Sequence, residues 1–160
     1  EMMERLKTYD WGGLRGTLVE LDAPIVAAQG DREKLAAIEE ALLGVLQSQA
    51  PLPAKEYICR QLALIGTARC VPVLATMLND APLADRARFA LQAIPDASAD
   101  EALRGALGTA EGIARIGIVN TLGERGDQQA VPLLTELRNS EDKMLSEAAG
   151  AALRKIGPPA

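Results

Sequence analysis

Hydrophobic positions in the last two-thirds of the chain recur at a nearly fixed spacing. Four segments that begin at residues 54, 83, 114 and 145 align with one another, at offsets of 29, 31 and 31 residues. Their apolar residues fall at positions i, i+4, i+8 and i+11, which form one stripe of about 80° on an α-helix. The pattern therefore predicts four amphipathic helices. Two aligned apolar columns run through them: Ile58, Ala87, Ile118 and Ala149, and Leu62, Leu91, Leu122 and Leu153.

Each predicted helix is followed by a residue that ends helices, at Gly66, Pro95, Gly126 and Gly157. We expect the glycines to adopt the left-handed conformation that closes a helix, and the proline to stop the helical hydrogen-bond ladder. A second apolar segment follows the first three turns, at residues 71–78, 102–107 and 131–137. Pro72 and Pro132 suit the first turn of a helix, where a backbone N–H is not needed. Each unit is therefore predicted to be a helix, a tight turn and a second helix.

The turn segments resemble a known repeat family. Residues 62–74 (LALIGTARCVPVL) and 122–134 (LGERGDQQAVPLL) are similar to the short HEAT-like repeat, also called the phycobilisome-lyase-type HEAT repeat, and residues 91–103 form a degenerate copy. Arg125 departs from this pattern at an Ile position, and Pro95 departs from it at a Gly position. The resemblance implies an all-α fold, a right-handed α–α superhelix of stacked antiparallel helix pairs.

The resemblance also implies where a function would be found. First helices would form the convex side of such a solenoid and second helices the concave side, which would hold other proteins. The predicted repeats are residues 51–80, 81–110 and 111–140, with a partial repeat at 141–160, within one continuous solenoid domain.

Residues 1–50 do not follow the repeat register, and we expect them to form an N-terminal helical cap, because a solenoid must cover its first apolar face. Asp31 is a candidate N-cap for a helix that continues to residue 46. Upstream, Trp11, Leu14, Leu18 and Leu21 have the spacing of another amphipathic helix. We expect an interruption of that helix at residues 22–24 (Asp-Ala-Pro).

Composition favours close-packed helices and limits catalysis. Alanine (28 residues) and leucine (23 residues) dominate the hydrophobic positions, and the chain has only four aromatic residues. We therefore expect the aromatic rings to lie outside the core columns. Because there is no histidine, hydrolases with a catalytic imidazole and His-ligated metal sites are excluded for this chain.

No other group of residues indicates an enzyme, a metal or a cofactor. Cys59 and Cys70 are interpreted as structural thiols, and the adjacent carboxylates at residues 39–40 as a solvated helix face. Residues 125–127 (Arg-Gly-Asp) match an adhesion tripeptide, but they fall in the turn column of the repeat and are interpreted as part of that turn.

Charge and hydropathy further limit the partners. The net charge of −5 offers no basic field for a nucleic acid, and residues 41–54, the longest uncharged stretch, contain too many polar residues and prolines to cross a membrane. The compartment stays open, because the chain begins at Glu1 and a targeting segment could precede it.

The sequence predicts a scaffold that binds a protein of unknown identity through its second helices. Exposed positions on these helices give five candidate binding residues: Thr76, Arg104, Thr135, Glu136 and Arg138. The arginines are favoured because arginine is enriched at binding hot spots. Three alternatives stay open: a lyase-type or chaperone-like subunit that acts on a chromophore protein, a structural spacer, and self-association through the solenoid ends.

Overall fold

The computed structural model describes residues 1–13 and 15–159, with the backbone alone for Thr17. The described residues form ten α-helices and two short 3-10 helices, and they contain no β-strand. The elements are α1 (Met2–Lys7), α2 (Gly16–Ala27), α3 (Arg32–Leu46), α4 (Leu52–Ile65), η1 (Ala68–Cys70), α5 (Val71–Thr76), α6 (Ala84–Ala93), α7 (Ala97–Ala106), α8 (Gly112–Arg125), η2 (Gln128–Ala130), α9 (Val131–Leu137) and α10 (Lys143–Ile156).

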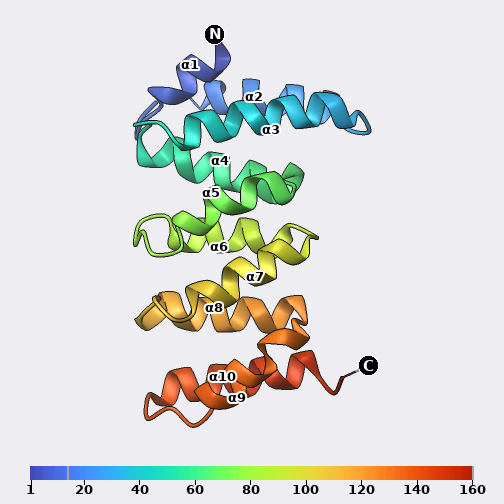
Figure 1. The fold of residues 1–160 in the computed structure, drawn as a ribbon. Helices are drawn as coiled ribbons and strands as arrows, with labels where there is room; N and C mark the ends of the chain where they lie inside the picture. Colours follow the sequence, from blue (N-terminus) through green and yellow to red (C-terminus); the bar gives the residue numbers. More distant parts are fainter. Residues whose placement is uncertain (14, 160) are drawn as a thin grey trace.

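From α2 onward the helices alternate between two rows (Figure 1). The A row consists of α2, α4, α6, α8 and α10, and the B row consists of α3, α5, α7 and α9. From α4 to α10, each A-row helix packs against the next one, and each B-row helix packs against the A-row helix that follows it in the chain. The described residues therefore form a solenoid of stacked helix pairs, as the resemblance implies, in which each pair packs mainly against its neighbours.

The predicted apolar columns form the core between the rows. Ile58, Ala87, Ile118 and Ala149 are buried, as are Leu62, Leu91 and Leu122, whereas Leu153 on the last helix is half-buried. The four predicted first helices are confirmed as α4, α6, α8 and α10, and the second helices as α5, α7 and α9.

The glycines that follow the A-row helices do not all act in the same way. Gly126 adopts the expected left-handed conformation, with φ of 68°, and Gly157 has a φ of 71° with an extended ψ. The prediction is wrong for Gly66, whose φ is −63°. A Cβ atom there would lie 2.4 Å from the carbonyl oxygen of Leu62 and 2.9 Å from Cys70 Sγ, so this glycine is required by close packing.

The N-terminal segment differs from the prediction at two points. No interruption occurs at residues 22–24, because α2 continues through Pro24 to Ala27. Two residues before Pro24, this helix is joined to α4: Asp22 accepts hydrogen bonds from Tyr57 Oη at 2.8 Å and from Gln61 Nε2 at 3.1 Å. Trp11 was predicted to lie on this helix but is in the turn that precedes it, and Leu14 lies outside the described residues.

The structure also tests the predicted N-cap Asp31 and the predicted position of the aromatic rings. Asp31 is the expected N-cap of α3, because its side chain accepts a hydrogen bond from the backbone N–H of Lys34. The four aromatic residues lie outside the two apolar columns, as predicted, but Tyr57, on α4 beside the column, is nevertheless buried and contacts α2. Its hydroxyl reaches Asp22, so the ring is buried with its polar end satisfied.

Candidate protein-binding surface

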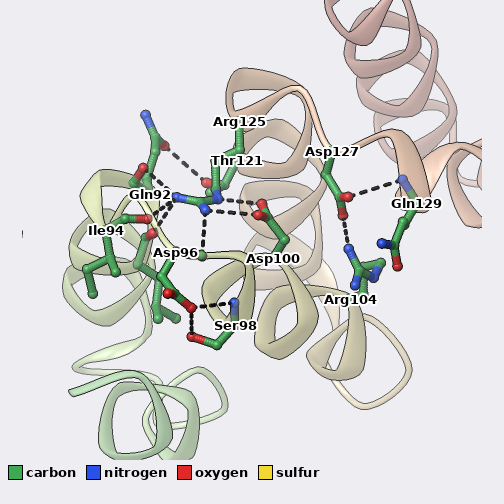
Figure 2. Close-up of polar contacts among 11 residues, drawn as sticks. Gln92, Ile94, Asp96, Ser98, Asp100, Arg104, Thr121, Arg125, Asp127 and Gln129 are labelled. Carbon is green, nitrogen blue, oxygen red and sulfur yellow. Dashed lines mark hydrogen bonds and ion pairs between the residues drawn. The ribbon is translucent and has the colours of Figure 1, made fainter. Parts of the chain in front are cut away.

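Arg125 joins the end of α8 to the end of α6, one unit earlier in the stack. Its Nη1 donates to the carbonyl oxygens of Leu91 and Gln92, both at 3.0 Å, and of Ile94 at 2.6 Å. Carbonyls in the last turn of a helix have no partner within the helix and carry the negative end of its dipole. The guanidinium therefore caps α6 from the neighbouring unit (Figure 2).

The same guanidinium forms a two-pronged ion pair with Asp100 on α7. Nε lies 2.5 Å from Oδ1 and Nη2 lies 2.9 Å from Oδ2, and the two side chains are only 10% and 19% exposed. Paired hydrogen bonds between arginine and a carboxylate are among the strong ones in proteins. Arg125 thus replaces the apolar residue of the repeat with a charge that is almost completely satisfied.

In a second ion pair the arginine is on α7 and the aspartate follows α8. Arg104 Nη1 on α7 lies 2.5 Å from Asp127 Oδ2, and these side chains are 18% and 7% exposed. Asp127 also caps η2 by accepting from the N–H of Gln129 at 3.1 Å. Helix α7 therefore contributes Asp100 and Arg104, and the α8–η2 turn contributes their partners Arg125 and Asp127 (Figure 2). We call these four residues the ion-pair joint.

The ion-pair joint explains the Arg-Gly-Asp tripeptide. Both of its charged side chains are turned into contacts with the preceding unit and are largely shielded from solvent. The interpretation of this tripeptide as part of the repeat turn is confirmed by these contacts.

Polar contacts also join units elsewhere in the stack. Glu39 on α3 was predicted to lie on a solvated face, but it is buried. Its carboxylate accepts hydrogen bonds from the backbone N–H of Thr67 at 2.8 Å and from its hydroxyl at 3.0 Å. Burial of this carboxylate is possible because the turn after α4 supplies those two donors.

The five candidate binding residues fall into two groups. Thr76, Thr135, Glu136 and Arg138 are exposed on or just after B-row helices. The hydroxyls of Thr76 and Thr135 donate to Val73 and Val131 carbonyls in their own helices, both at 2.7 Å, which leaves their oxygen lone pairs for a partner. Arg104 is different, because its guanidinium is occupied by Asp127 in the ion-pair joint.

A cleft of about 580 Å³ lies beside Thr76 on the B row. Leu46, Val73 and Met77 give it apolar walls, and Lys55 and Asp80 add one charge of each sign. Sequence reasoning selected Thr76 by register alone and missed this cleft, because residues from α3, α4 and α5 meet there only in the folded chain.

The structure offers little to catalysis among the residues it describes. No group of three potential metal ligands occurs in this part of the chain. Burial raises the pKa of both Cys59 and Cys70 to about 12, so both thiols are protonated near neutral pH. Among the described helices, none has both the length and the apolar character that a membrane crossing requires.

Comparison with known proteins agrees with the repeat pattern. The sequence profile for HEAT repeats matches residues 80–154, from the loop before α6 almost to the end of α10. A search of curated proteins finds no match to the chain. The matched segment contains both sides of the ion-pair joint, and the helix pairs before it continue the same two rows. The chain is therefore a HEAT-like repeat protein.

Proposed function

We propose that this chain is a non-catalytic module that binds a partner protein through the exposed side chains of its B row. HEAT repeats generally serve as scaffolds for protein interaction. The observation that carries the proposal is the cleft beside Thr76, which combines apolar walls with charges of both signs. Such a mixed lining suits a protein surface with an apolar centre and polar surroundings.

The proposed surface extends along the B row to α9. Leu133 on α9 is 40% exposed, and Thr135, Glu136 and Arg138 lie close to it in sequence and are exposed. These residues offer an apolar contact next to two charges. Arg104 has a positioning role in this proposal, because its ion pair with Asp127 fixes α7 against the turn that leads to α9.

In this proposal the rest of the chain has a structural role. Residues 1–50 would act as the N-terminal cap of the repeats at 51–160, with α10 as the first helix of a partial repeat. Self-association through the ends of the stack is less favoured, because the exposed side chains of α10 include Glu147, Arg154 and Lys155. A subunit that acts on a chromophore protein gains no support from the two protonated, buried thiols.

The proposal can be tested by capture of partners from a native lysate of the source cells. The B-row variant carries Thr76→Arg, Glu136→Ala and Arg138→Ala, three changes at exposed positions. A matched A-row variant carries Leu64→Ser and Ile113→Ser, because both side chains are exposed on that row. We expect the B-row variant to lose a protein that wild type and the A-row variant retain.

Melting temperature serves as the control, since all five positions are exposed and both variants should fold as wild type does. Equal capture by wild type and the B-row variant would overturn the proposal.

A further inference from the structure

A second cleft, of about 910 Å³, lies on the A row and gathers the chain's aromatic residues. It lies between the turn before α2 and helices α2, α4 and α6, and three of the four aromatic residues line it: Tyr9, Trp11 and Phe89. Trp11 is 75% exposed and Phe89 is 56% exposed. A chain with so few aromatic rings thus exposes two of them at one site, and exposed apolar side chains gathered around a cleft mark binding surfaces.

The cleft is also basic, in contrast to the molecule as a whole. Arg15, Arg60 and Arg86 line it together with a single carboxylate, Glu56. The only ion pair between them among the described residues is a loose one, with Arg86 Nε 3.9 Å from Glu56 Oε1. The chain carries a net charge of −5, so the cleft has the opposite sign to the chain as a whole.

One of these arginines is held in place by the core. The Arg60 guanidinium carbon lies 5.6 Å from the ring centre of Tyr57, within the range of a cation–π contact. Tyr57 is itself fixed by its hydrogen bonds to Asp22 and to the Leu18 carbonyl on α2. The fourth aromatic residue therefore positions a cation beside the cleft.

We propose that this A-row cleft binds a short acidic segment of a partner protein, with carboxylates on the arginines and an apolar side chain against Trp11 and Phe89. Arginine pairs well with carboxylates, and aromatic rings provide apolar area with little conformational entropy to lose. The cleft is distinct from the B-row surface, so this proposal does not depend on the proposed function above.

The charge distribution selects a short peptide over an extended polyanion. Charges act over about 8 Å at physiological salt, so a peptide seated in the cleft experiences mainly the local arginines. A nucleic acid or an anionic membrane would also lie against the acidic remainder of the molecule, where repulsion opposes binding.

Trp11 provides the readout, because it is the only tryptophan of the chain and lines the cleft. The full chain is titrated at low salt with the capped hexapeptide Asp-Glu-Phe-Asp-Leu-Glu while tryptophan emission is recorded. We expect a saturable shift of the emission to shorter wavelength. An analogue with Asn and Gln in place of Asp and Glu, and one with Ser in place of Phe and Leu, should each bind at least about tenfold more weakly.

Variants locate the binding site. The pair Arg60→Gln and Arg86→Gln should weaken binding about tenfold, whereas the pair Arg32→Gln and Arg154→Gln, which removes the same charge from exposed sites elsewhere, should not. Phe89→Ala should weaken binding, and Ile113→Ala, at another exposed A-row position, is its control. All six side chains are exposed, and the melting temperature of each variant verifies folding.

Four results would overturn the proposal. They are the absence of a saturable response to the hexapeptide, equal binding by the neutral analogue, equal weakening by the two arginine pairs, and a stronger response to phosphatidylserine vesicles or a single-stranded oligonucleotide. An emission shift that depends on protein concentration without peptide would also overturn it, because a second copy of the chain would then occupy the cleft.

Discussion

Two contacts of α8 hold neighbouring units together by opposite means. On one side, the ion-pair joint connects its C-terminal end to α7 through two nearly buried charge pairs. On the other side, Gly123 lies against α10 so closely that a Cβ atom would be 2.7 Å from Ala152 Cα and 2.8 Å from its Cβ. We call this second contact the glycine joint. One helix therefore depends on complementary charge at one contact and on the absence of a side chain at the other.

The difference shows what each contact requires. Buried charges lose hydration and stabilise a fold only when every partner is present, so the ion-pair joint is sensitive to the loss of any member. Close packing of apolar atoms needs no partner group but has no spare volume, so the glycine joint is sensitive to added atoms. The two joints should therefore respond differently to the removal of a side chain, to added side-chain atoms, to neutralisation of a charge pair and to low pH.

The largest effect should come from Arg125→Ala. This change leaves the Asp100 carboxylate without its arginine and removes the donor that caps three carbonyls at the end of α6. We expect the free energy of unfolding to fall by about 3 kcal/mol, measured by urea denaturation. Arg138→Ala, at an exposed site, should change it by no more than about 0.5 kcal/mol. Similar losses in both variants would contradict the assignment of Arg125 to a structural joint.

Gly123→Val should have the next largest effect. The added atoms would meet Ala152 at distances that no relaxed structure allows, and we expect a loss of about 2 kcal/mol. Gly44→Ala is the control, because an added Cβ there meets open space on α3. Alanine is the better helix former, so the control should gain about 0.5 kcal/mol. A neutral Gly123→Val variant would show that α8 and α10 separate easily.

A double-mutant cycle isolates the Arg104–Asp127 pair. Arg104→Met removes the charge, and Asp127→Asn keeps an oxygen acceptor for the cap of η2. We expect a coupling energy of about 1 kcal/mol from denaturation of the four proteins. The same cycle on Lys143 and Glu147, whose side chains are 86% and 68% exposed and 3.9 Å apart, should give a value near zero. Equal coupling in the two cycles would remove the distinction between the joint and a surface pair.

The smallest effect concerns acid. Hydrogen bonds from the Ser98 hydroxyl and backbone N–H, aided by the charge of Arg125, hold the pKa of Asp96 below its ordinary value of 3.8. A depressed pKa means that the stabilisation is present above pH 3.8 and is lost as the pH falls below that value. We expect Asp96→Asn to melt with a weaker pH dependence between about pH 4 and pH 2 than wild type. Identical pH profiles would assign the acid sensitivity to other carboxylates.

The sequence was sufficient to predict the repeats but not their detailed conformations. Apolar columns at a spacing of about 30 residues located the helices from α4 to α10, since burial of one stripe determines which face turns inward. The conformation of Gly66 and the continuity of α2 through Pro24 escaped prediction. At Gly66 the constraint is a close approach to the Leu62 carbonyl oxygen and to Cys70 Sγ, which a hydrophobic pattern does not reveal. Helix α2 is joined to Tyr57 and Gln61, which are distant in the sequence.

The ion-pair joint could have been recognised from a signal that was present but not used. Arg125 stands where other units have isoleucine, and a charge in an apolar column requires a partner of opposite sign. Asp100, on the preceding predicted helix, supplies that partner. Four residues later, Arg104 supplies the partner of Asp127 in the second ion pair. The two clefts left no such signal, because each brings together residues from three or more elements.

The position of the ion-pair joint within the stack bears on the cooperativity of unfolding. In a linear array of units, unfolding is all-or-none only while each interface is strong relative to the stability of the units it connects. We expect a weakened joint between α7 and α8 to lower the coupling between residues 1–106 and 112–159, which would then be joined mainly by the packing of α6 against α8. The slope of a urea transition would then decrease and the transition would broaden into two steps. Together with the packing of α6 against α8, the four charged side chains therefore form the interface on which unfolding as one body depends.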